Sequence, residues 1–265
     1  MQDIKYPINC NITNALRNCL PVCLSDLNVY GFDCIDSTNS FARSLLDKGI
    51  VDPTVILSNG QTDGRGRRGK SFYSPSDTGL YMTLMYCADR GSDFLRVTSK
   101  SAVALYRSIL NVTGTEVGIK WVNDIYLNGK KVAGILSELV QLRSDPERNG
   151  VIVGIGINLS TSSFPPDIKE VAGSLNLKTN KYELASEIIK ELYTLLILSS
   201  DNSYMEDYRK HSIILDKEIT YERNGIIRKG IASSINDNGA LLVLLPDGTT
   251  DTLSSGEISV RTLKS

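Results

Sequence analysis

The sequence predicts an α+β fold, with a mixed, largely antiparallel sheet that packs against helices and a small antiparallel β-barrel at the C-terminus. Its 265 residues suit one large domain with a small appendage. Helical and strand-like periods alternate up to about residue 213, whereas the rest of the chain holds only short strands separated by turn residues. We therefore expect two domains, at residues 1–213 and 214–265.

The expected helices follow from apolar residues at helical spacing. Ser37, Thr38 and Asn39 open the first helix, and Gly49 ends it. Asp93 is the expected cap of the second, because a short polar side chain accepts hydrogen bonds from the first amides of a helix. Residues 1–30 are weakly patterned, and no element is assigned to them. The helices are expected at residues 37–48, 93–110, 182–198 and in a shorter segment that ends near residue 211.

Short apolar runs bounded by turn residues predict the strands. Asn128-Gly129 lies between two such runs and is a strong type I′ hairpin signal, because both residues tolerate a positive φ. Residues 59–79 hold five glycines and a dense basic cluster, and we expect a long loop there. The strands are expected at residues 31–36, 55–58, 80–87, 117–122, 125–127, 131–140 and 151–159.

Composition and charge argue against several classes of protein. The net charge is −1 and the pI is about 6.0, so no global attraction to DNA or to anionic membranes is expected. No run of residues approaches the ~18 apolar residues of a membrane span, and the N-terminus lacks the features of a secretion signal. Five cysteines and one histidine, His211, do not supply the paired ligands of a zinc finger. We expect a reduced, cytoplasmic protein that binds neither DNA nor membranes.

The expected loop contains a basic segment at residues 64–71 that matches the letters of a phosphate-binding P-loop, G-x-x-x-x-G-K-S. A P-loop must leave a strand directly and open a helix. Here the preceding strand ends near residue 58 and turn formers follow, so the P-loop interpretation fails. Glycines let a backbone approach a ligand closely, and arginines bind phosphate or carboxylate through paired hydrogen bonds. We interpret the segment as a clamp over an anionic ligand; a solvated loop or a nucleic-acid patch is the alternative.

Five blocks of the sequence resemble, in order, the signature blocks of bacterial biotin protein ligases. The blocks are Asp36–Asn39, Gln61–Gly69, Lys120–Asp124, Lys130–Leu136 and Gly154–Asn158. The turn-rich tail is similar to the C-terminal domain of that family, so the resemblance covers the chain from about residue 30 onward. It implies the short form of the enzyme, without an N-terminal DNA-binding domain, on a class II synthetase-like ligase fold.

The resemblance also implies an activity. ATP and biotin would react to give biotinyl-5′-AMP, and the biotinyl group would pass to a lysine of a biotin carboxyl carrier protein. Mg²⁺ is expected with ATP, and Asp124 is a candidate ligand for it. The sequence is also compatible with a homodimer.

The same resemblance implies roles for individual residues. The catalytic charges are assigned to Lys131, Arg67 and Lys120, which would neutralise two reacting anions. The expected biotin site comprises Ser37, Thr38, Asn39, Gln61, Arg65, Gly66, Arg67, Lys131, Gly134, Gly154 and Gly156. The expected ATP and adenylate site comprises Arg67, Arg68, Lys70, Lys120, Asn123, Asp124 and Asn158.

Ordinary structural roles are open for several of these residues. Ser37 or Thr38 could simply cap a helix, Asn158 could end its strand, and the single tryptophan, Trp121, is expected in the core rather than at a ligand. Three positions depart from the family pattern: Val122 stands for a usual proline, Asp63 for a small residue and Lys70 for an arginine. None of the three removes a group that the chemistry requires.

Two other functions stay open beside biotin ligation. A lipoate-type protein ligase is the nearest alternative, and a biotin-responsive regulator or nucleic-acid-binding protein is the second. A helix-turn-helix needs two helices with support, and the residues before the first block offer no basic recognition helix. RNA binding through the arginines would need stacking aromatic residues, and Phe72 and Tyr73 do lie beside them.

Overall fold

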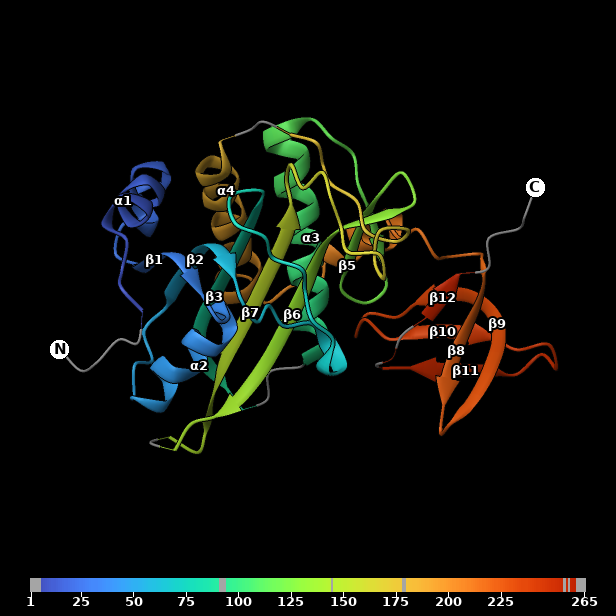
Figure 1. The fold of residues 1–265 in the computed structure, drawn as a ribbon. Coiled ribbons are helices and arrows are strands. Elements are labelled where there is room, and N and C mark those ends of the chain that lie inside the picture. The colour runs from blue at the N-terminus through green and yellow to red at the C-terminus, as the bar shows by residue number, and fades with distance from the viewer. Residues whose placement is uncertain are drawn as a thin grey trace.

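The computed structural model describes residues 6–90, 94–143, 145–177, 180–254, 256 and 258–260. A seven-stranded sheet with helices on both faces forms the larger part, and a five-stranded sheet stands beside one end of it (Figure 1). The order of the large sheet is β1-β2-β3-β7-β6-β5-β4. β1 and β2 pair in parallel, and the other neighbours pair antiparallel. The predicted mixed, largely antiparallel sheet is therefore confirmed.

The elements have the following bounds. The large sheet consists of β1 (Asn28–Ile35), β2 (Thr54–Gln61), β3 (Gly79–Asp89), β4 (Gly118–Lys120), β5 (Asp124–Leu127), β6 (Lys130–Gln141) and β7 (Arg148–Asn158). The helices are α1 (Cys10–Cys19), α2 (Thr38–Asp47), α3 (Phe94–Thr113), α4 (Lys181–Tyr193), which continues as a π-helical turn (Thr194–Leu198), and α5 (Tyr204–Lys210). The small sheet consists of β8 (Glu218–Arg223), β9 (Ile226–Ile235), β10 (Leu241–Leu244), β11 (Thr250–Leu253) and β12 (Ile258–Val260).

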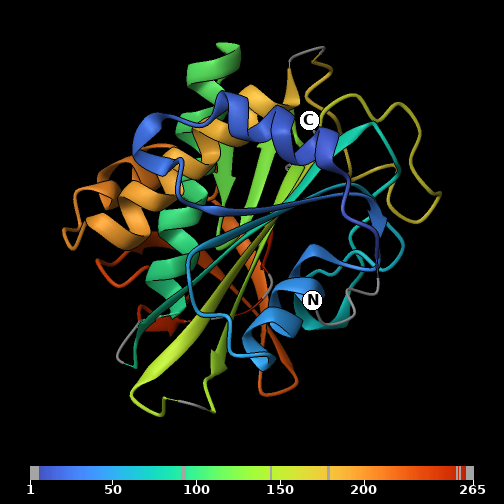
Figure 2. The ribbon, with the colours of Figure 1, turned by 90° about the vertical axis from the view of Figure 1, so that its left-hand side faces the viewer.

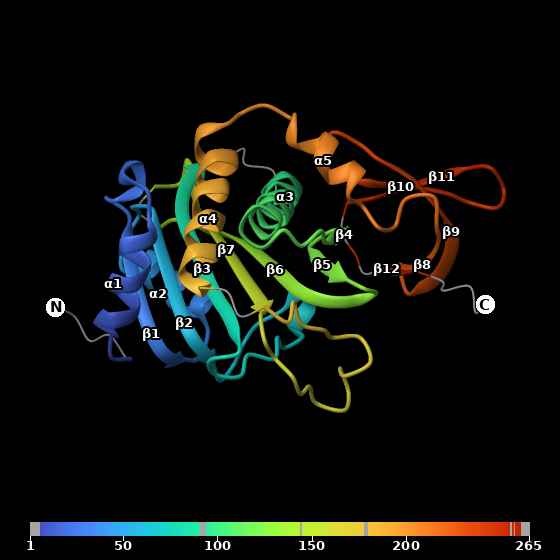
Figure 3. The same cartoon turned by 90° about the horizontal axis from the view of Figure 1, so that it is seen from above.

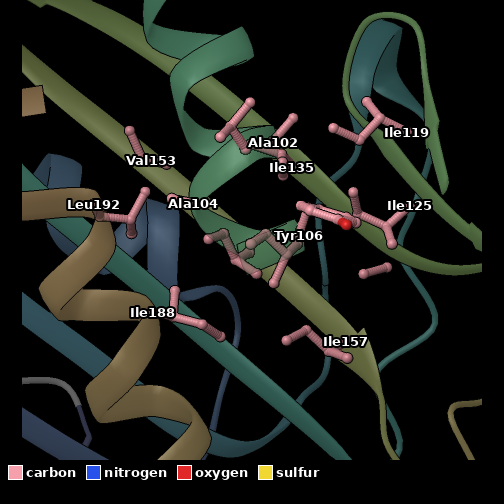
Figure 4. Packing of buried hydrophobic residues seen from close by; sticks show 14 of the residues in the cluster. Ala102, Ala104, Tyr106, Ile119, Ile125, Ile135, Val153, Ile157, Ile188 and Leu192 are labelled. Carbon is pink, nitrogen blue, oxygen red and sulfur yellow. The ribbon is translucent and has the colours of Figure 1, made fainter. Parts of the chain in front are cut away.

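The two faces of the large sheet are covered unequally. α3 and α4 lie on one face (Figure 3), where Tyr106, Ile188 and Leu192 pack against the strands (Figure 4). Each such buried side chain contributes about 1.5–3 kcal/mol. On the other face, α2 packs its apolar side against a smaller cluster that includes Ile56 and Met85. The rest of that face carries glycines and polar residues, and the candidate site lies there.

The predicted hairpin between β5 and β6 is confirmed. Asn128 has φ 50° and Gly129 has φ 76°, as the type I′ turn requires. The same geometry recurs at Asn224 and Gly225, with φ 55° and 77°, between β8 and β9. Both turns set the strand register, which decides the face on which each side chain lies.

The C-terminal domain is antiparallel, as predicted, but it is not a closed barrel. Its order is β11-β10-β9-β8-β12. Within the described residues, β11 and β12 are the two edges and do not pair with each other. The predicted barrel is therefore corrected to an open five-stranded sheet. Turn residues between β11 and β12 predict a hairpin of these two neighbours, but β12 pairs instead with β8, which is distant in the sequence.

Helix α1 is an element that the sequence analysis missed. Asn9 caps it through its side chain, and Asn9 N donates to the Gly31 carbonyl oxygen at 2.7 Å. The Thr13 hydroxyl accepts from Gly31 N at 3.0 Å. Figure 2 faces this edge of the sheet, with α1 lying in front of it. The helix therefore covers part of the free edge of β1, where unpaired backbone groups would otherwise invite pairing with another chain.

The other differences lie at element ends. The strand predicted at 117–122 spans only Gly118–Lys120, and the strand predicted at 55–58 extends to Gln61. The proposed cap Asp93 lies outside the described residues. Among the residues that the structure describes, no helix is both long enough and apolar enough to cross a membrane.

Candidate functional site

A cavity of about 330 Å³ opens on the face of the large sheet opposite α3. Pockets of roughly 300–1,000 Å³ are typical of small-molecule sites. All of the predicted site residues line it except Arg68 and Asn158. The five sequence blocks thus meet in one place, although more than a hundred residues separate the first from the last.

Buried hydroxyl and amide groups form one end of the cavity. Gln61 Oε1 accepts from the backbone amide of Thr38 at 2.9 Å, and Gln61 Nε2 donates to the Ser74 hydroxyl at 2.9 Å. The Thr83 hydroxyl lies within 2.8 Å of Thr38 Oγ1 and 2.7 Å of Asn39 Oδ1. These contacts fix the directions of the polar groups before any ligand binds, and such a surface suits a small polar ring.

Ser37 occupies the N-cap position of α2 and also lines the cavity. Within the described chain its hydroxyl makes no capping hydrogen bond. The helix therefore positions this side chain without using it as a cap. The ligand-facing interpretation of Ser37 is compatible with the geometry, and the alternative of a simple side-chain cap is not.

Glycines let side chains and ligand approach the floor of the cavity. A Cβ on Gly154 would lie 2.0 Å from Asn39 Oδ1, and one on Gly156 would lie 2.5 Å from the Phe72 ring. Gly134 is the direct partner of Gly156 on the neighbouring strand. Side chains at these positions would displace the residues that line the cavity, since real Cβ contacts are longer.

The basic loop folds back on itself as a tight turn over the cavity. Arg65 bridges Ser71, Gly66 N donates to the Lys70 carbonyl oxygen at 2.7 Å, and Phe72 N donates to the Gly64 carbonyl oxygen at 2.7 Å. Arg68 has φ 55° at the tip of the turn. The turn directs Arg65, Arg67 and Lys70 to the cavity, whereas Arg68 is not among its lining residues in the described chain.

Arg67 connects the loop to two other parts of the chain. Its Nη1 donates to Asn123 Oδ1 at 3.1 Å and to the Gly256 carbonyl oxygen at 3.4 Å. Gly256 and Ile258 belong to the C-terminal domain and line the cavity. That domain therefore supplies one wall, which the sequence analysis did not foresee.

Two lysines lie at the cationic end of the cavity. Lys131 Nζ pairs with Asp124 Oδ1 at 2.6 Å. Lys120 Nζ lies 5.2 Å from the centroid of the Tyr126 ring and donates to its hydroxyl at 3.4 Å. Burial raises the pKa of Tyr126, and the Asp124 carboxylate raises it further against the opposing effect of Lys131. Tyr126 therefore stays protonated at neutral pH and holds the Lys120 ammonium group without neutralising it.

Asn158 has the structural role that the sequence left open. Its side chain is buried, and Nδ2 donates to the Gly173 carbonyl oxygen at 2.8 Å. It fastens the segment after β7, and Val171 of that segment lines the cavity. The buried Oδ1 of Asn158 has no hydrogen-bond partner among the described residues, and its role toward the adenylate stays a prediction.

Several lining residues were missed or assigned elsewhere. Trp121 was expected in the core, and it is buried there with its Nε1 donating to the Gly239 carbonyl oxygen at 2.9 Å, but it also lines the cavity. Phe72 and Tyr126 were not predicted as cavity residues; their positions inside or next to the signature blocks are the signal that could have found them.

Val122, which stands where the family usually has proline, is held in place by packing and by a hydrogen bond. Val122 is buried, and its carbonyl oxygen accepts from the Tyr208 hydroxyl at 3.0 Å. The segment between Trp121 and Asn123 is thus held by a residue of α5 that lies far along the chain. Asp63 is exposed at the surface of the loop, and its amide donates to the Asp36 carbonyl oxygen at 2.9 Å.

The acidic residues define what metal the site could hold. Asp124 is the one carboxylate among the described residues that line the cavity. The described part of the chain contains no group of three or more histidine, cysteine, aspartate or glutamate residues placed to hold a metal ion. Mg²⁺ commonly binds through one or two carboxylates together with substrate phosphates. The residues fit a nucleotide-bound Mg²⁺ and do not fit an all-protein metal cage.

Family models match both parts of the chain. The model of the biotin/lipoate A/B protein ligase family matches residues 31–158, and the model of the biotin protein ligase C-terminal domain matches residues 214–261. The second match begins next to the domain boundary that we propose at residue 214.

The chain is also similar to named relatives. It is 34% identical over 182 residues to the bifunctional ligase/repressor BirA of Bacillus spizizenii, which covers 68% of this chain and 54% of the relative. It is 25% identical to the biotin–[acetyl-CoA-carboxylase] ligase of Mycobacterium tuberculosis, with 85% and 87% covered. The chain spans about half the length of the two Bacillus relatives that it matches, 54% and 45%.

The chain is also similar to solved structures of biotin protein ligases. The biotin protein ligase of Aquifex aeolicus in complex with biotin and ATP superposes with a TM-score of 0.74 at 25% identity, with 88% of this chain and 98% of that chain covered. The Leishmania major ligase in complex with biotinyl-5-AMP gives 0.58 at 25% identity, with 86% and 99% covered. Together, the ordered sequence blocks, the two matched family models and the shared fold show that the chain belongs to the biotin protein ligase family.

Proposed function

We propose that this chain is an ATP-dependent biotin protein ligase. The observation that carries the proposal is one cavity with a neutral hydrogen-bonding end, formed by residues such as Thr38, Asn39 and Gln61, and a cationic end that holds Lys131 and Arg67. Biotin has the same division, with a polar ureido ring at one end and a carboxylate at the other. The dithiolane ring of lipoate would make less use of the hydroxyl and amide groups, so biotin is the better match.

The proposed reaction has two steps. An oxygen of the biotin carboxylate attacks the α-phosphorus of ATP, and the bond to pyrophosphate breaks as the new O–P bond forms. The neutral amine of a carrier lysine then attacks the carbonyl carbon of biotinyl-5′-AMP. A C–N bond replaces the C–O bond to AMP, and the amine loses a proton.

The first step brings two anions together, and the cations of the cavity reduce the electrostatic repulsion between them. Lys131 sits at the start of β6 with its charge oriented by Asp124, and Lys120 is held by Tyr126. Fixed charges of this kind stabilise developing negative charge without reorganising during the reaction. Mg²⁺, held by the nucleotide phosphates with Asp124, would add further charge neutralisation when bound.

The remaining parts of the proposal concern the cell and the partners. The carrier lysine belongs to a biotin carboxyl carrier protein, and the activity is cytoplasmic, which the five free cysteine thiols support. We also propose that the protein can assemble as a homodimer. Sequence-specific DNA binding is not part of the proposal, because a net charge of −1 gives little electrostatic attraction to phosphates.

The function is tested by giving the protein ATP, Mg²⁺, biotin and a biotin carboxyl carrier domain, and measuring the mass of the carrier. We expect the carrier to gain one biotinyl group only when ATP and biotin are both present. A parallel reaction with lipoate and a lipoyl domain should give no gain. If lipoate is transferred and biotin is not, the proposed substrate is wrong.

Replacing Lys131 should remove a charge that acts in the transition state. We expect Lys131→Ala to fold and to form biotinyl-5′-AMP at least about 100-fold more slowly, as for other lost transition-state charges. The adjacent Lys130 is exposed, and its Nζ donates to the Lys169 carbonyl oxygen, so Lys130→Ala is the matched control. Pyrophosphate release measures the rate. Similar rates in the two variants would exclude the assigned role of Lys131.

Arg67 and Arg68 form a second matched pair, because they are neighbours and Arg67 alone of the two lines the cavity. Charged hydrogen bonds contribute about 1.5–3 kcal/mol, which corresponds to about tenfold or more in affinity. We therefore expect Arg67→Met to release biotinyl-5′-AMP at least about tenfold faster than the wild type, and Arg68→Met to retain it. Release is measured by trapping the free adenylate. Equal retention by both variants would show that the loop does not clamp the intermediate.

A further inference from the structure

Glu138 lies beside the cavity without being one of the residues that line it in the described chain. It is on β6, two residues beyond the lining residue Leu136, so both side chains emerge on the same face of the sheet. Only 15% of its side chain is exposed. A carboxylate in such a position requires partners, because burying an unpaired charge is costly.

The three partners of Glu138 come from two segments of the chain, α2 and the glycine-rich loop. Asn39 Nδ2 donates to Oε2 at 2.9 Å. Arg43 Nη2 donates to Oε1 at 3.0 Å, and Arg65 Nη1 lies 3.6 Å from the same oxygen. One carboxylate therefore connects the start of α2, its second turn and the glycine-rich loop.

The contact with Asn39 sets the orientation of an amide inside the cavity. An ionised carboxylate only accepts hydrogen bonds, so the NH₂ group of Asn39 must face Glu138. The same NH₂ group donates to the Leu136 carbonyl oxygen at 3.3 Å, and Oδ1 lies 2.7 Å from the Thr83 hydroxyl, beneath the space left by Gly154. Glu138 and the Leu136 carbonyl oxygen, which are both acceptors, together fix which atom of the Asn39 side chain faces each neighbour.

The contact with Arg65 holds the base of the basic turn. Arg65 lines the cavity and bridges Ser71 across the turn. Four cations lie within six residues of this loop, and their mutual repulsion opposes its closure. The carboxylate of Glu138 offsets part of that repulsion from outside the cavity.

We propose that Glu138 is a positioning residue, which orients the Asn39 amide and holds Arg65, and with it the glycine-rich loop, over the cavity before the ligand binds. This inference rests on the proposed function, because its catalytic test uses biotin. Glu138 touches no reacting atom. Its effect should appear as weaker binding of biotin with nearly unchanged chemistry, since the oriented groups contact the ground state and the transition state alike.

The test compares Glu138→Gln with Arg43→Gln in the full-length protein. Glutamine keeps the size of Glu138 but removes its charge, whereas Arg43→Gln removes another partner of the same carboxylate and leaves Asn39 and Arg65 in place. We expect Glu138→Gln to raise the KM for biotin at least about tenfold with kcat for adenylate formation within about threefold. Arg43→Gln should stay within about threefold of the wild type in both.

Limited trypsin digestion gives a readout that does not depend on activity. Cleavage within residues 65–70 of the ligand-free protein should be at least about fivefold faster in Glu138→Gln than in the wild type. The reason is that the fraction of molecules with an open loop rises when an interaction that holds the loop closed is lost. Arg43→Gln should be cleaved at close to the wild-type rate. If Glu138→Gln does not fold, Glu138→Asp keeps the charge on a shorter side chain and should show the same changes to a smaller degree.

The outcomes separate the two proposals. A wild-type protein that does not activate biotin contradicts the proposed function, while the digestion still tests the role of Glu138. Wild-type biotin KM and wild-type loop cleavage in a folded Glu138 variant would overturn the inference. Equal effects of the Glu138 and Arg43 substitutions would also overturn it, because they would show that the carboxylate acts by tethering α2 to the sheet.

Discussion

The central constraint on this molecule is that part of one sheet face must carry no side chains. Gly154 and Gly156 on β7 and Gly134 on β6 leave room for Asn39, for the Phe72 ring and for a ligand between them. The opposite face of the same strands is packed by α3 and α4. Because side chains alternate along a strand, one sequence has to provide apolar residues for the core and glycines for the cavity at every second position. The stability of the sheet therefore comes mainly from the covered face.

Electrostatics explains why the cavity is assembled from distant segments. A site for two anionic reactants needs several cations, and cations brought together repel one another unless carboxylates are interspersed. Asp124 pairs with Lys131 inside the cavity, and Glu138 pairs with Arg65 outside it. In both cases the carboxylate gives the lysine or arginine side chain a defined direction. The C-terminal domain takes part through the Gly256 carbonyl oxygen, which accepts from Arg67.

Local signals explain what the sequence could predict. Helical periods predicted α2, α3 and α4, the Asn128-Gly129 turn predicted the β5–β6 hairpin, and the ordered blocks supplied most of the cavity lining. α1 packs on β1 and α4, but its cap Asn9 and its buried Ile12 and Leu16 at helical spacing are local signals that could have found it. The rest depends on contacts between distant residues. Gly256 and Glu138 acquire their roles because folding brings them to Arg67 and to Asn39, and their local sequence does not indicate these contacts.

The dependence of the site on its bare sheet face is tested most directly by biotin binding to Gly154→Ala, measured by calorimetry. A Cβ at this position would lie 2.0 Å from Asn39 Oδ1, so the amide must move. Gly150→Ala is the matched control, because Gly150 lies on the same strand as Gly154 and outside the described cavity lining. A Cβ at Gly150 would lie 2.4 Å from the Leu46 side chain of α2. The account predicts that Gly154→Ala binds biotin at least about tenfold more weakly, a loss of about 1.4 kcal/mol, while Gly150→Ala binds it normally. Wild-type affinity in a folded Gly154→Ala protein would contradict the account.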